Sequence, residues 1–289
     1  MAISAVILTF NEEKHIARCI NSLKDSVDHV YVLDSFSTDD TLKILAEFSG
    51  FVTVKQNKFV NHAFQFNMAL TLFDIKTDWV MRIDADEIID SDLNVWLNSE
   101  LYRTDSSVTG VSVNRHMTFM NKPLCFGGMS SYWMLRIWRN GYAHCEQRWM
   151  DEHMVLSSGH VIRANGKLID DNLNNLSWWA HKHVDYSTRE AIDVLIRDTL
   201  PDEHFDFIRV CKKFYNNLPL FVRPFFYFVY RYFFRLGFLD GRIGFLWNFL
   251  QGFWYRMMVD AKIFEIKREA FLSNTTIKDV IKNKYGYEI

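Results

Sequence analysis

Two carboxylates just beyond an apolar run are the residues best placed to do chemistry. Asp84 and Asp86 follow Trp79–Ile83, a segment typical of a buried strand. Carboxylates two positions apart at a strand end can share a hard divalent cation, and Mg²⁺ or Mn²⁺ held in this way usually also binds substrate phosphates. The alternative is a solvated acidic turn, because Glu87 and Asp90 continue the acidic run. The spacing thus predicts a Mg²⁺ or Mn²⁺ site at Asp84 and Asp86, with a surface turn as the competing interpretation.

The elements that must position this pair follow a repeating pattern. Short apolar runs rich in β-branched residues alternate with segments of helical periodicity, which indicates an α/β fold with a parallel sheet. The predicted strands are 3–10, 29–33, 51–55 and 79–83. Ligands bind at the carboxyl ends of the strands in such sheets, and Thr9, Asp34 and Asp84 all fall there.

Two patterns resemble the capping box, in which a Ser or Thr side chain and an acid three residues later cap a helix start. Ser37 with Asp40 predicts a helix over 38–48, and Ser187 with Glu190 predicts one that ends near residue 198.

Three motifs in the first 90 or so residues resemble the family 2 glycosyltransferases, inverting sugar-nucleotide enzymes of GT-A fold. I-L-T-F-N-E-E at 7–13 is similar to the family's opening motif, and R-I-D-A-D-E at 82–87 to its metal motif. V-Y-V-L-D-S-F-S-T-D-D-T at 30–41 matches its strand-Asp-x-x-Ser-x-Asp-x-Thr signature. The resemblance implies a mostly parallel GT-A sheet with helices on both faces. More loosely, nearly the whole chain looks like the lipopolysaccharide-core and surface-polysaccharide transferases of this family.

The resemblance also implies roles for individual residues. Base and ribose contacts are expected from Thr9, Phe10, Glu12 and Asp34, a ribose-diphosphate contact from Asn67, and metal-diphosphate contacts from Asp84 and Asp86. The chain departs from the family at Phe66, where an Arg or Lys often precedes this Asn. Neutralisation of the diphosphate must then come mainly from the metal or from another cation.

An inverting transfer needs a carboxylate that accepts the proton of the attacking hydroxyl. Asp151-Glu152-His153 is the best candidate tract. The resemblance points to Glu152 first and Asp151 second, with two exposed acids at a turn as the alternative. His181 and His183 could bind a metal, but histidines beside tryptophans are more often packed or face a phosphate, so a ligand role is the weaker hypothesis.

The C-terminal part is basic and aromatic. Residues 207–268 contain 11 Lys and Arg against three acids, and 20 aromatic residues fall between 205 and 255. A helix from Pro224 would place Arg231 and Arg235 on one side among phenylalanines, followed by a turn at 237–241 and a second apolar helix at 243–255. This pattern predicts helices lying on an anionic membrane surface, with a buried hairpin as the alternative. Nucleic-acid binding is not expected, because runs of phenylalanine are unusual in such surfaces.

These observations predict a catalytic GT-A domain at 1–200, in which 1–100 binds the nucleotide sugar and 101–200 the acceptor, and a membrane-associating helical tail at 201–289. No basic leader precedes the first apolar run, so we expect a cytoplasmic protein, peripheral at the inner leaflet, that acts on a lipid-linked glycan. Two alternatives remain: a non-catalytic membrane assembly protein on a transferase fold, and a D-x-D phosphatase. The phosphatase interpretation is the weaker, because it leaves Asp34 without a role.

Overall fold

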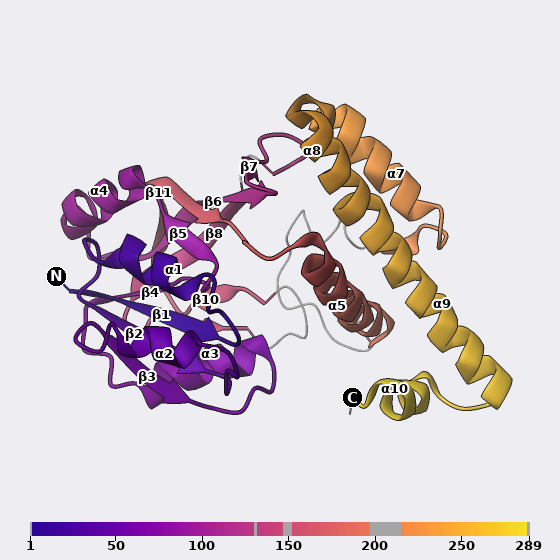
Figure 1. Cartoon of the computed structure of the whole chain (residues 1–289), viewed down its shortest axis with the longest axis horizontal. Helices are drawn as coiled ribbons and strands as arrows, with labels where there is room; N and C mark the ends of the chain where they lie inside the picture. Colours follow the sequence, from indigo (N-terminus) through magenta and orange to yellow (C-terminus); the bar gives the residue numbers. More distant parts are fainter. Residues whose placement is uncertain (1, 130–131, 147–151, 197–214, 288–289) are drawn as a thin grey trace. The chain divides into compact units, whose positions relative to one another are not determined.

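The computed structural model describes residues 2–129, 132–146, 152–196 and 215–287. The chain divides into two compact units, each with its own core (Figure 1). The first unit consists of Met1–Cys125 and Met129–Asn174, and the second of Phe126–Gly128 and Asn175–Ile289. The predicted domain boundary at residue 200 lies outside the described residues.

Four parallel strands in the order β3-β2-β1-β4 form the first half of the sheet. Alternate side chains of β1 point to opposite faces, so Ala5 and Ile7 join a core with helices α1, α2 and α4, while Val6 joins a second core with α3. The predicted helices on both faces are therefore confirmed. The elements are β1 (Ile3–Thr9), α1 (Ile16–Leu23), β2 (His29–Asp34), α2 (Thr41–Ala46), β3 (Val52–Gln56), α3 (His62–Leu72) and β4 (Trp79–Arg82).

The second half of the sheet runs β8-β6-β11-β5 and mixes parallel with antiparallel pairs. Strand β8 pairs antiparallel with both β4 and β6, whereas β6 and β11 are parallel. The α/β class is confirmed, with the continuous parallel order confined to the first four strands. The elements are β5 (Glu87–Ile89), α4 (Ser91–Ser99), η1 (Leu101–Arg103), β6 (Val108–Phe119), β7 (Lys122–Pro123), β8 (Tyr132–Arg139), β9 (Ala143–Cys145), β10 (Met154–Leu156) and β11 (His160–Asp170).

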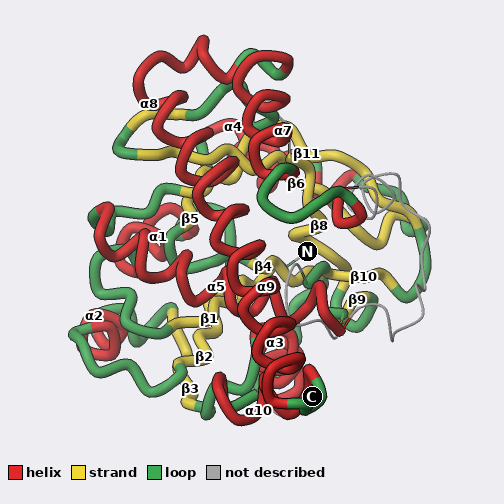
Figure 2. The backbone as a smooth tube through the Cα atoms, turned by 90° about the vertical axis from the view of Figure 1, so that its right-hand side faces the viewer, coloured by secondary structure: helices red, strands yellow, loops and turns green. Residues whose placement is uncertain are grey.

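The second unit is helical. Helices α5 and α9 lie side by side, as Figures 1 and 2 both show, and share a core that includes Ala191, Val259 and Ile263. The predicted turn near 237–241 is confirmed, because Leu236 adopts a left-handed conformation and a 3₁₀ turn follows it. The elements are α5 (Leu176–Ile196), α7 (Arg223–Val229), η3 (Tyr230–Phe234), η4 (Gly237–Asp240), α8 (Gly241–Trp247), η5 (Asn248–Trp254), α9 (Tyr255–Ser273) and α10 (Ile277–Tyr285).

The start of α5 differs from the prediction. The helix begins at Leu176 rather than at Ser187, because the Asn175 side chain accepts a hydrogen bond from the Trp178 backbone N–H at 2.9 Å and caps it. Ser187 lies inside the helix, where its hydroxyl donates to the Val184 carbonyl at 2.7 Å. The predicted capping box at Ser187 is therefore wrong.

The predicted basic stripe at Arg231 and Arg235 is also wrong. Arg231 is buried, and its Nε donates to the Gly127 carbonyl at 2.8 Å, whereas Arg235 is exposed. Arg223 is buried as well, with its Nε 2.8 Å from Asp260 Oδ1. Much of the positive charge in this segment thus serves packing inside the helical unit.

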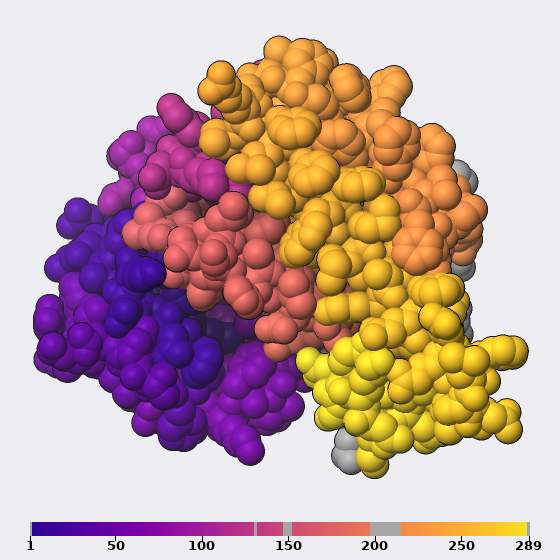
Figure 3. Space-filling model, turned by 45° about the vertical axis from the view of Figure 1, so that its right-hand side comes forward, coloured from indigo at the N-terminus to yellow at the C-terminus, as the bar shows by residue number. Residues whose placement is uncertain are grey.

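Aromatic and aliphatic side chains nevertheless remain on the surface of the helical unit, in the orange part of Figure 3. Phe234 is the most exposed of this group, at 76%. None of the helices in the described part of the chain is both long enough and apolar enough to span a bilayer. The exposed group, hereafter the aromatic surface, comprises Phe225, Phe226, Tyr230, Phe233, Phe234, Leu236, Phe238, Leu239, Phe245 and Phe249.

Candidate active site

Asp34 lies at the end of β2 and organises the loop that follows it. Its carboxylate accepts hydrogen bonds from Thr9 Oγ1 at 3.0 Å, Gln56 Nε2 at 3.0 Å and the Ser37 N–H at 2.9 Å. The Ser37 hydroxyl also donates to Asp34, so it does not cap a helix, and α2 begins only at Thr41. The predicted capping box at Ser37 is therefore wrong. Because the Asp34 side chain is fully buried and amply hydrogen-bonded, it holds the two loops after β1 and β2 in place.

The loop after β1 presents one apolar ring and one paired acid. Phe10 is 57% exposed, so it is available for ligand contact. Glu12 accepts a hydrogen bond from His15 Nδ1 at 2.7 Å. His15 Nε2 accepts from the Leu173 N–H at 2.9 Å, which assigns the ring proton to Nδ1. Glu12 thus takes part in fixing the start of α1, and its contact with a base or ribose stays a prediction.

Asn67 connects α3 to β9. Its Nδ2 donates to the Cys145 carbonyl and its Oδ1 accepts from the Cys145 N–H, both at 2.8 Å. This paired contact imitates a strand pairing and anchors the segment that leads toward Glu152. The expected contact of Asn67 with a ribose-diphosphate stays a prediction.

Asp84 lies between two arginines. Arg136 Nη2 is 3.0 Å from Asp84 Oδ2, and Arg82 Nε is 3.6 Å from Asp84 Oδ1. Burial would raise the pKa of Asp84, but the Arg136 and Arg82 guanidinium groups hold it well below its usual range. Asp86 Oδ2 accepts a hydrogen bond from Asn172 Nδ2 at 3.0 Å. Neighbouring side chains therefore hold both carboxylates of the pair in place.

Glu87 shows that the acidic run is not a solvated turn. It is fully buried, its Oε2 accepts from the Asp84 N–H at 2.8 Å, and its Oε1 is 2.8 Å from Arg136 Nη2. Burial, opposed by Arg136, raises the pKa of Glu87 to about 8. Asp90 caps α4 by accepting from the Leu93 N–H at 2.8 Å. The surface-turn alternative is therefore wrong for Glu87 and Asp90, whereas Asp84 and Asp86 are half-buried beside a turn at residues 85 and 86.

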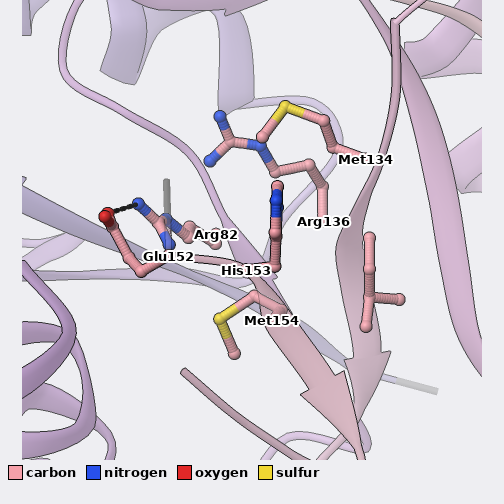
Figure 4. A pocket seen from close by; sticks show the side chains of 7 residues that line it. Arg82, Met134, Arg136, Glu152, His153 and Met154 are labelled. Atoms are coloured by element: carbon pink, nitrogen blue, oxygen red, sulfur yellow. Dashed lines mark hydrogen bonds and ion pairs between the residues drawn. The ribbon is translucent and has the colours of Figure 1, made fainter. Parts of the chain in front are cut away.

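Glu152 lies in the same neighbourhood as the Asp84 pair. Its Oε1 is 3.2 Å from Arg82 Nη2, and Figure 4 shows the two side chains facing each other at a small pocket of about 20 Å³. Arg136 and His153 also line this pocket. The structure thus brings Glu152 and Asp84 within 4 Å of one guanidinium group, that of Arg82. Asp151, the second candidate base, lies outside the described residues.

His183 is packed, as the stronger of the two hypotheses had it. Its ring stacks on Trp179 with 3.6 Å between the centroids, and its Nδ1 is 2.8 Å from the Trp179 carbonyl oxygen. Burial lowers the pKa of His183 to about 4. Among the described residues no group of three or more His, Cys, Asp or Glu side chains could hold a metal ion. A divalent ion would accordingly depend on one or two carboxylates together with substrate oxygens, which is the usual mode for Mg²⁺.

Sequence reasoning gave Arg82 and Arg136 no role of their own. Arg82 was visible as the first residue of R-I-D-A-D-E, two positions before the acidic pair. Arg136 interrupts the apolar run of β8, and a charged residue there is a signal of a buried ion pair. Its partners could not be inferred, because they come from a different strand.

A comparison with models of known protein families finds a match. Residues 4–153, slightly more than half of the chain, match the model of glycosyl transferase family 2. The chain belongs to this family. The match covers Asp34, Asp84, Asp86 and Glu152, so the members of the candidate site all lie within the family segment.

Curated relatives match over a shorter part of the chain. An uncharacterized glycosyltransferase of Rickettsia felis is 44% identical over 91 residues, which are 32% of this chain and 31% of the relative. The SPbeta prophage-derived glycosyltransferase SunS of Bacillus subtilis is 36% identical over 86 residues, 30% of this chain and 20% of the relative. The chain thus spans about a third or less of the length of these relatives.

Two solved structures are similar to the chain at lower sequence identity. S. aureus TarS 1-349, in complex with UDP-GlcNAc, aligns with 95% of this chain and 93% of its own at 14% identity and a TM-score of 0.49. Glucosyl-3-phosphoglycerate synthase from Mycobacterium tuberculosis, in complex with Mn²⁺, UDP and glucosyl-3-phosphoglycerate, aligns with 40% of this chain and 44% of its own, at 29% identity and a TM-score of 0.32.

Proposed function

We propose that the chain is an inverting, metal-dependent glycosyltransferase that moves a sugar from a nucleotide-sugar donor to a hydroxyl of a lipid-linked or lipopolysaccharide-type acceptor. The observation that carries this proposal is the shared position of Asp84 and Glu152 around Arg82. Such an arrangement places the acids proposed to hold the departing diphosphate next to the acid proposed to accept the proton. A binding protein that performs no chemistry has no need for both.

In this proposal Glu152 is the general base. It accepts the proton of the acceptor hydroxyl while the hydroxyl oxygen forms its bond to the anomeric carbon, and the bond from that carbon to the diphosphate breaks. Inversion follows from this single in-line displacement. The Glu152 side chain is only 14% exposed, which limits competition from water at the base.

Asp86 and Asp84 would hold Mg²⁺ or Mn²⁺ together with the diphosphate. The ion would supply positive charge that stabilises the leaving group. The residues fit such an ion only when it is shared with substrate. Asp84 is already paired with Arg136 and Arg82. Asp86 accepts a hydrogen bond from Asn172 with one of its carboxylate oxygens. Asp86 is accordingly the better-placed protein ligand.

The donor would lie at the carboxyl ends of β1, β2 and β4. Phe10 is exposed beside the loops that Asp34 fixes, so it is placed to contact a base. Thr9, Glu12 and Asn67 complete the proposed donor site. Of these, Thr9 bonds to Asp34 and Asn67 to Cys145, so both act at least by positioning the loops and strands around the donor.

The acceptor class is proposed from the helical unit. The helical unit exposes the ten residues of the aromatic surface and also Arg235 and Arg242. Aromatic side chains combined with exposed cations favour an anionic bilayer surface, where a lipid-linked glycan would also be found. We therefore propose peripheral association with the inner leaflet of the cytoplasmic membrane. Membrane assembly without catalysis remains the second candidate, favoured by the same surface.

The experiment that tests the catalytic proposal begins with a thermal-shift screen of UDP-, GDP- and dTDP-sugars with Mn²⁺. Hydrolysis or transfer of the donor that stabilises the protein is then compared between wild type and Glu152→Gln. Loss of a general base typically costs about 10²–10⁴ in rate, whereas donor binding should survive.

Asp151→Asn is the matched variant, one residue away in the chain. Activity retained by Glu152→Gln and lost by Asp151→Asn would move the base to Asp151. Activity in both variants would contradict a catalytic role for the whole tract. A wild type that binds lipid but neither hydrolyses nor transfers any nucleotide sugar would favour the non-catalytic alternative.

A further inference from the structure

Arg82 has an unusual set of neighbours for a single side chain. Its Nη2 is 3.2 Å from Glu152 Oε1, its Nε is 3.6 Å from Asp84 Oδ1, and its Nη1 is 3.7 Å from Cys145 Sγ. The guanidinium carbon lies 5.0 Å from the centre of the Phe66 ring. The side chain is mostly buried, yet it borders the pocket that Glu152 and Arg136 also line (Figure 4).

The two carboxylates depend on Arg82 to different degrees. Asp84 has a second cation, because Arg136 Nη2 is 3.0 Å from its other oxygen. For Glu152, by contrast, Arg82 is the cation within salt-bridge distance in the described part of the chain. If Arg82 moved away, Asp84 would stay neutralised and Glu152 would lose its counter-ion.

Arg82 also has unused capacity to donate hydrogen bonds. Its Nε is buried and, among the described atoms, has no hydrogen-bond partner, since the 3.6 Å to Asp84 is too long for one. A guanidinium group presents its donors in a planar fork that matches two phosphate oxygens. Phosphate oxygens entering beside Asp84 would therefore compete with the single 3.2 Å contact to Glu152.

We propose that Arg82 alternates between two anions: it pairs with Glu152 when the donor site is empty and binds the donor's diphosphate when the site is filled. This inference rests on the proposed function, in which Glu152 is the base and a diphosphate binds at Asp84 and Asp86. A carboxylate held in an ion pair is a weaker proton acceptor than a free one. Donor binding would thus release the base at the moment when the sugar is in position.

The test measures binding of inorganic pyrophosphate, in the presence of Mg²⁺, to the full-length protein by titration calorimetry. Arg82→Gln should weaken binding about tenfold or more, because it removes a charged hydrogen-bond donor. Glu152→Gln should strengthen binding by about threefold, since Arg82 then has no internal competitor. Arg82→Lys should retain part of the affinity, as it keeps the charge but loses the planar fork.

Two further variants separate this mechanism from simpler ones. In the double variant Arg82→Gln with Glu152→Gln, the gain from the second change should vanish, because that gain acts through Arg82. A gain that persists would show that Glu152 merely repels the anion, and would overturn the proposal. Arg139→Gln is the matched control: Arg139 lies 4.7 Å from the centre of the Trp79 ring, opposite the first residue of β4 rather than its last. Its pyrophosphate affinity should equal that of the wild type.

Unchanged binding in Arg82→Gln, or a wild type that does not bind pyrophosphate, would overturn the proposal. If thermal unfolding shows that Arg82→Gln is not folded, the pyrophosphate affinities of Glu152→Gln and Arg82→Lys test the proposal instead. Both variants keep a cation at position 82. Failure of the proposed function has a different signature. In that case pyrophosphate binding depends on Arg82 as predicted, but the wild type neither hydrolyses nor transfers any nucleotide sugar.

Discussion

Replacing His183 with phenylalanine should make the helical unit less sensitive to acid. The ring of His183 stacks on Trp179 and lies 5.5 Å from the ring of Tyr255, measured between centroids. Burial lowers its pKa to about 4, from an ordinary value of 6.5. The packed site thus accommodates the neutral imidazole and disfavours the charged one.

The sign and size of the effect follow from proton linkage. Between pH 6.5 and about pH 4 the unfolded chain binds a proton at His183 that the folded chain does not, so acid favours unfolding over this range. From pH 7 to pH 5 the two pKa values correspond to a loss of about 2 kcal/mol in the free energy of unfolding. Phenylalanine retains the stacked ring but cannot bind the proton, so this loss should disappear in His183→Phe.

The measurement is urea unfolding at pH 7 and pH 5, followed by tryptophan fluorescence. Trp179, Trp247 and Trp254 cluster in this part of the helical unit, so its unfolding contributes to the signal. His181→Phe is the matched control, since His181 is on the same helix but exposed, and this variant should keep the wild-type pH dependence. An equal pH dependence in His183→Phe and wild type would refute the argument from burial.

Two further predictions follow from the other sites. Asp86→Asn should abolish sugar transfer without lowering the unfolding temperature, and EDTA should do the same to the wild type, because the leaving diphosphate then lacks its divalent ion; full turnover in EDTA would exclude the metal role. Reversing both Arg235 and Arg242 to Glu should lower co-sedimentation with anionic vesicles by about tenfold or more, since each cation near such a surface contributes about 1 kcal/mol. Arg231→Gln, which removes a buried contact with Gly127, should instead lower stability. Equal sedimentation of the double reversal and the wild type, or no sedimentation of either, would argue against membrane association.

The first half of the sheet and its site could be predicted because the signals are local. Each early strand is a short β-branched run, and parallel order follows from the helices between the runs. Thr9 and Asp34 end neighbouring strands, and the prediction that strand ends meet is confirmed by their 3.0 Å hydrogen bond. In this part of the chain, the order of the predicted strands and helices is sufficient to predict which residues lie close together.

The other residues of the site depend on pairings that no local pattern contains. Arg136 reaches Asp84 only because β8 pairs antiparallel with β4, more than 50 residues away along the chain. Similarly, Arg223 pairs with Asp260, 37 residues away in the sequence, so counting positive charge in that segment overstated the charge at the surface. The two predicted capping boxes failed for a different reason, because each serine hydroxyl bonds to a residue only three positions earlier in the chain. The Ser37 hydroxyl donates to a carboxylate, and the Ser187 hydroxyl donates to a backbone carbonyl. The sequence pattern of a serine followed by an acid three residues later is the same whether or not the serine caps a helix.

Phe66 illustrates how the sequence and the structure combine. The family resemblance indicates that the cation often found next to the Asn67 position is missing, so that neutralisation of the diphosphate is expected mainly from the metal or from another cation. In the structure the guanidinium of Arg82 lies over the Phe66 ring, which places a positive charge in that neighbourhood from a strand instead of a helix. The change of element has a consequence for the proposed chemistry. A cation carried by α3 would serve the diphosphate alone, whereas Arg82 is two residues from Asp84 and in contact with Glu152. In the proposed mechanism Arg82 would both bind the donor and restrain the base, so that donor binding would release the base in the same step.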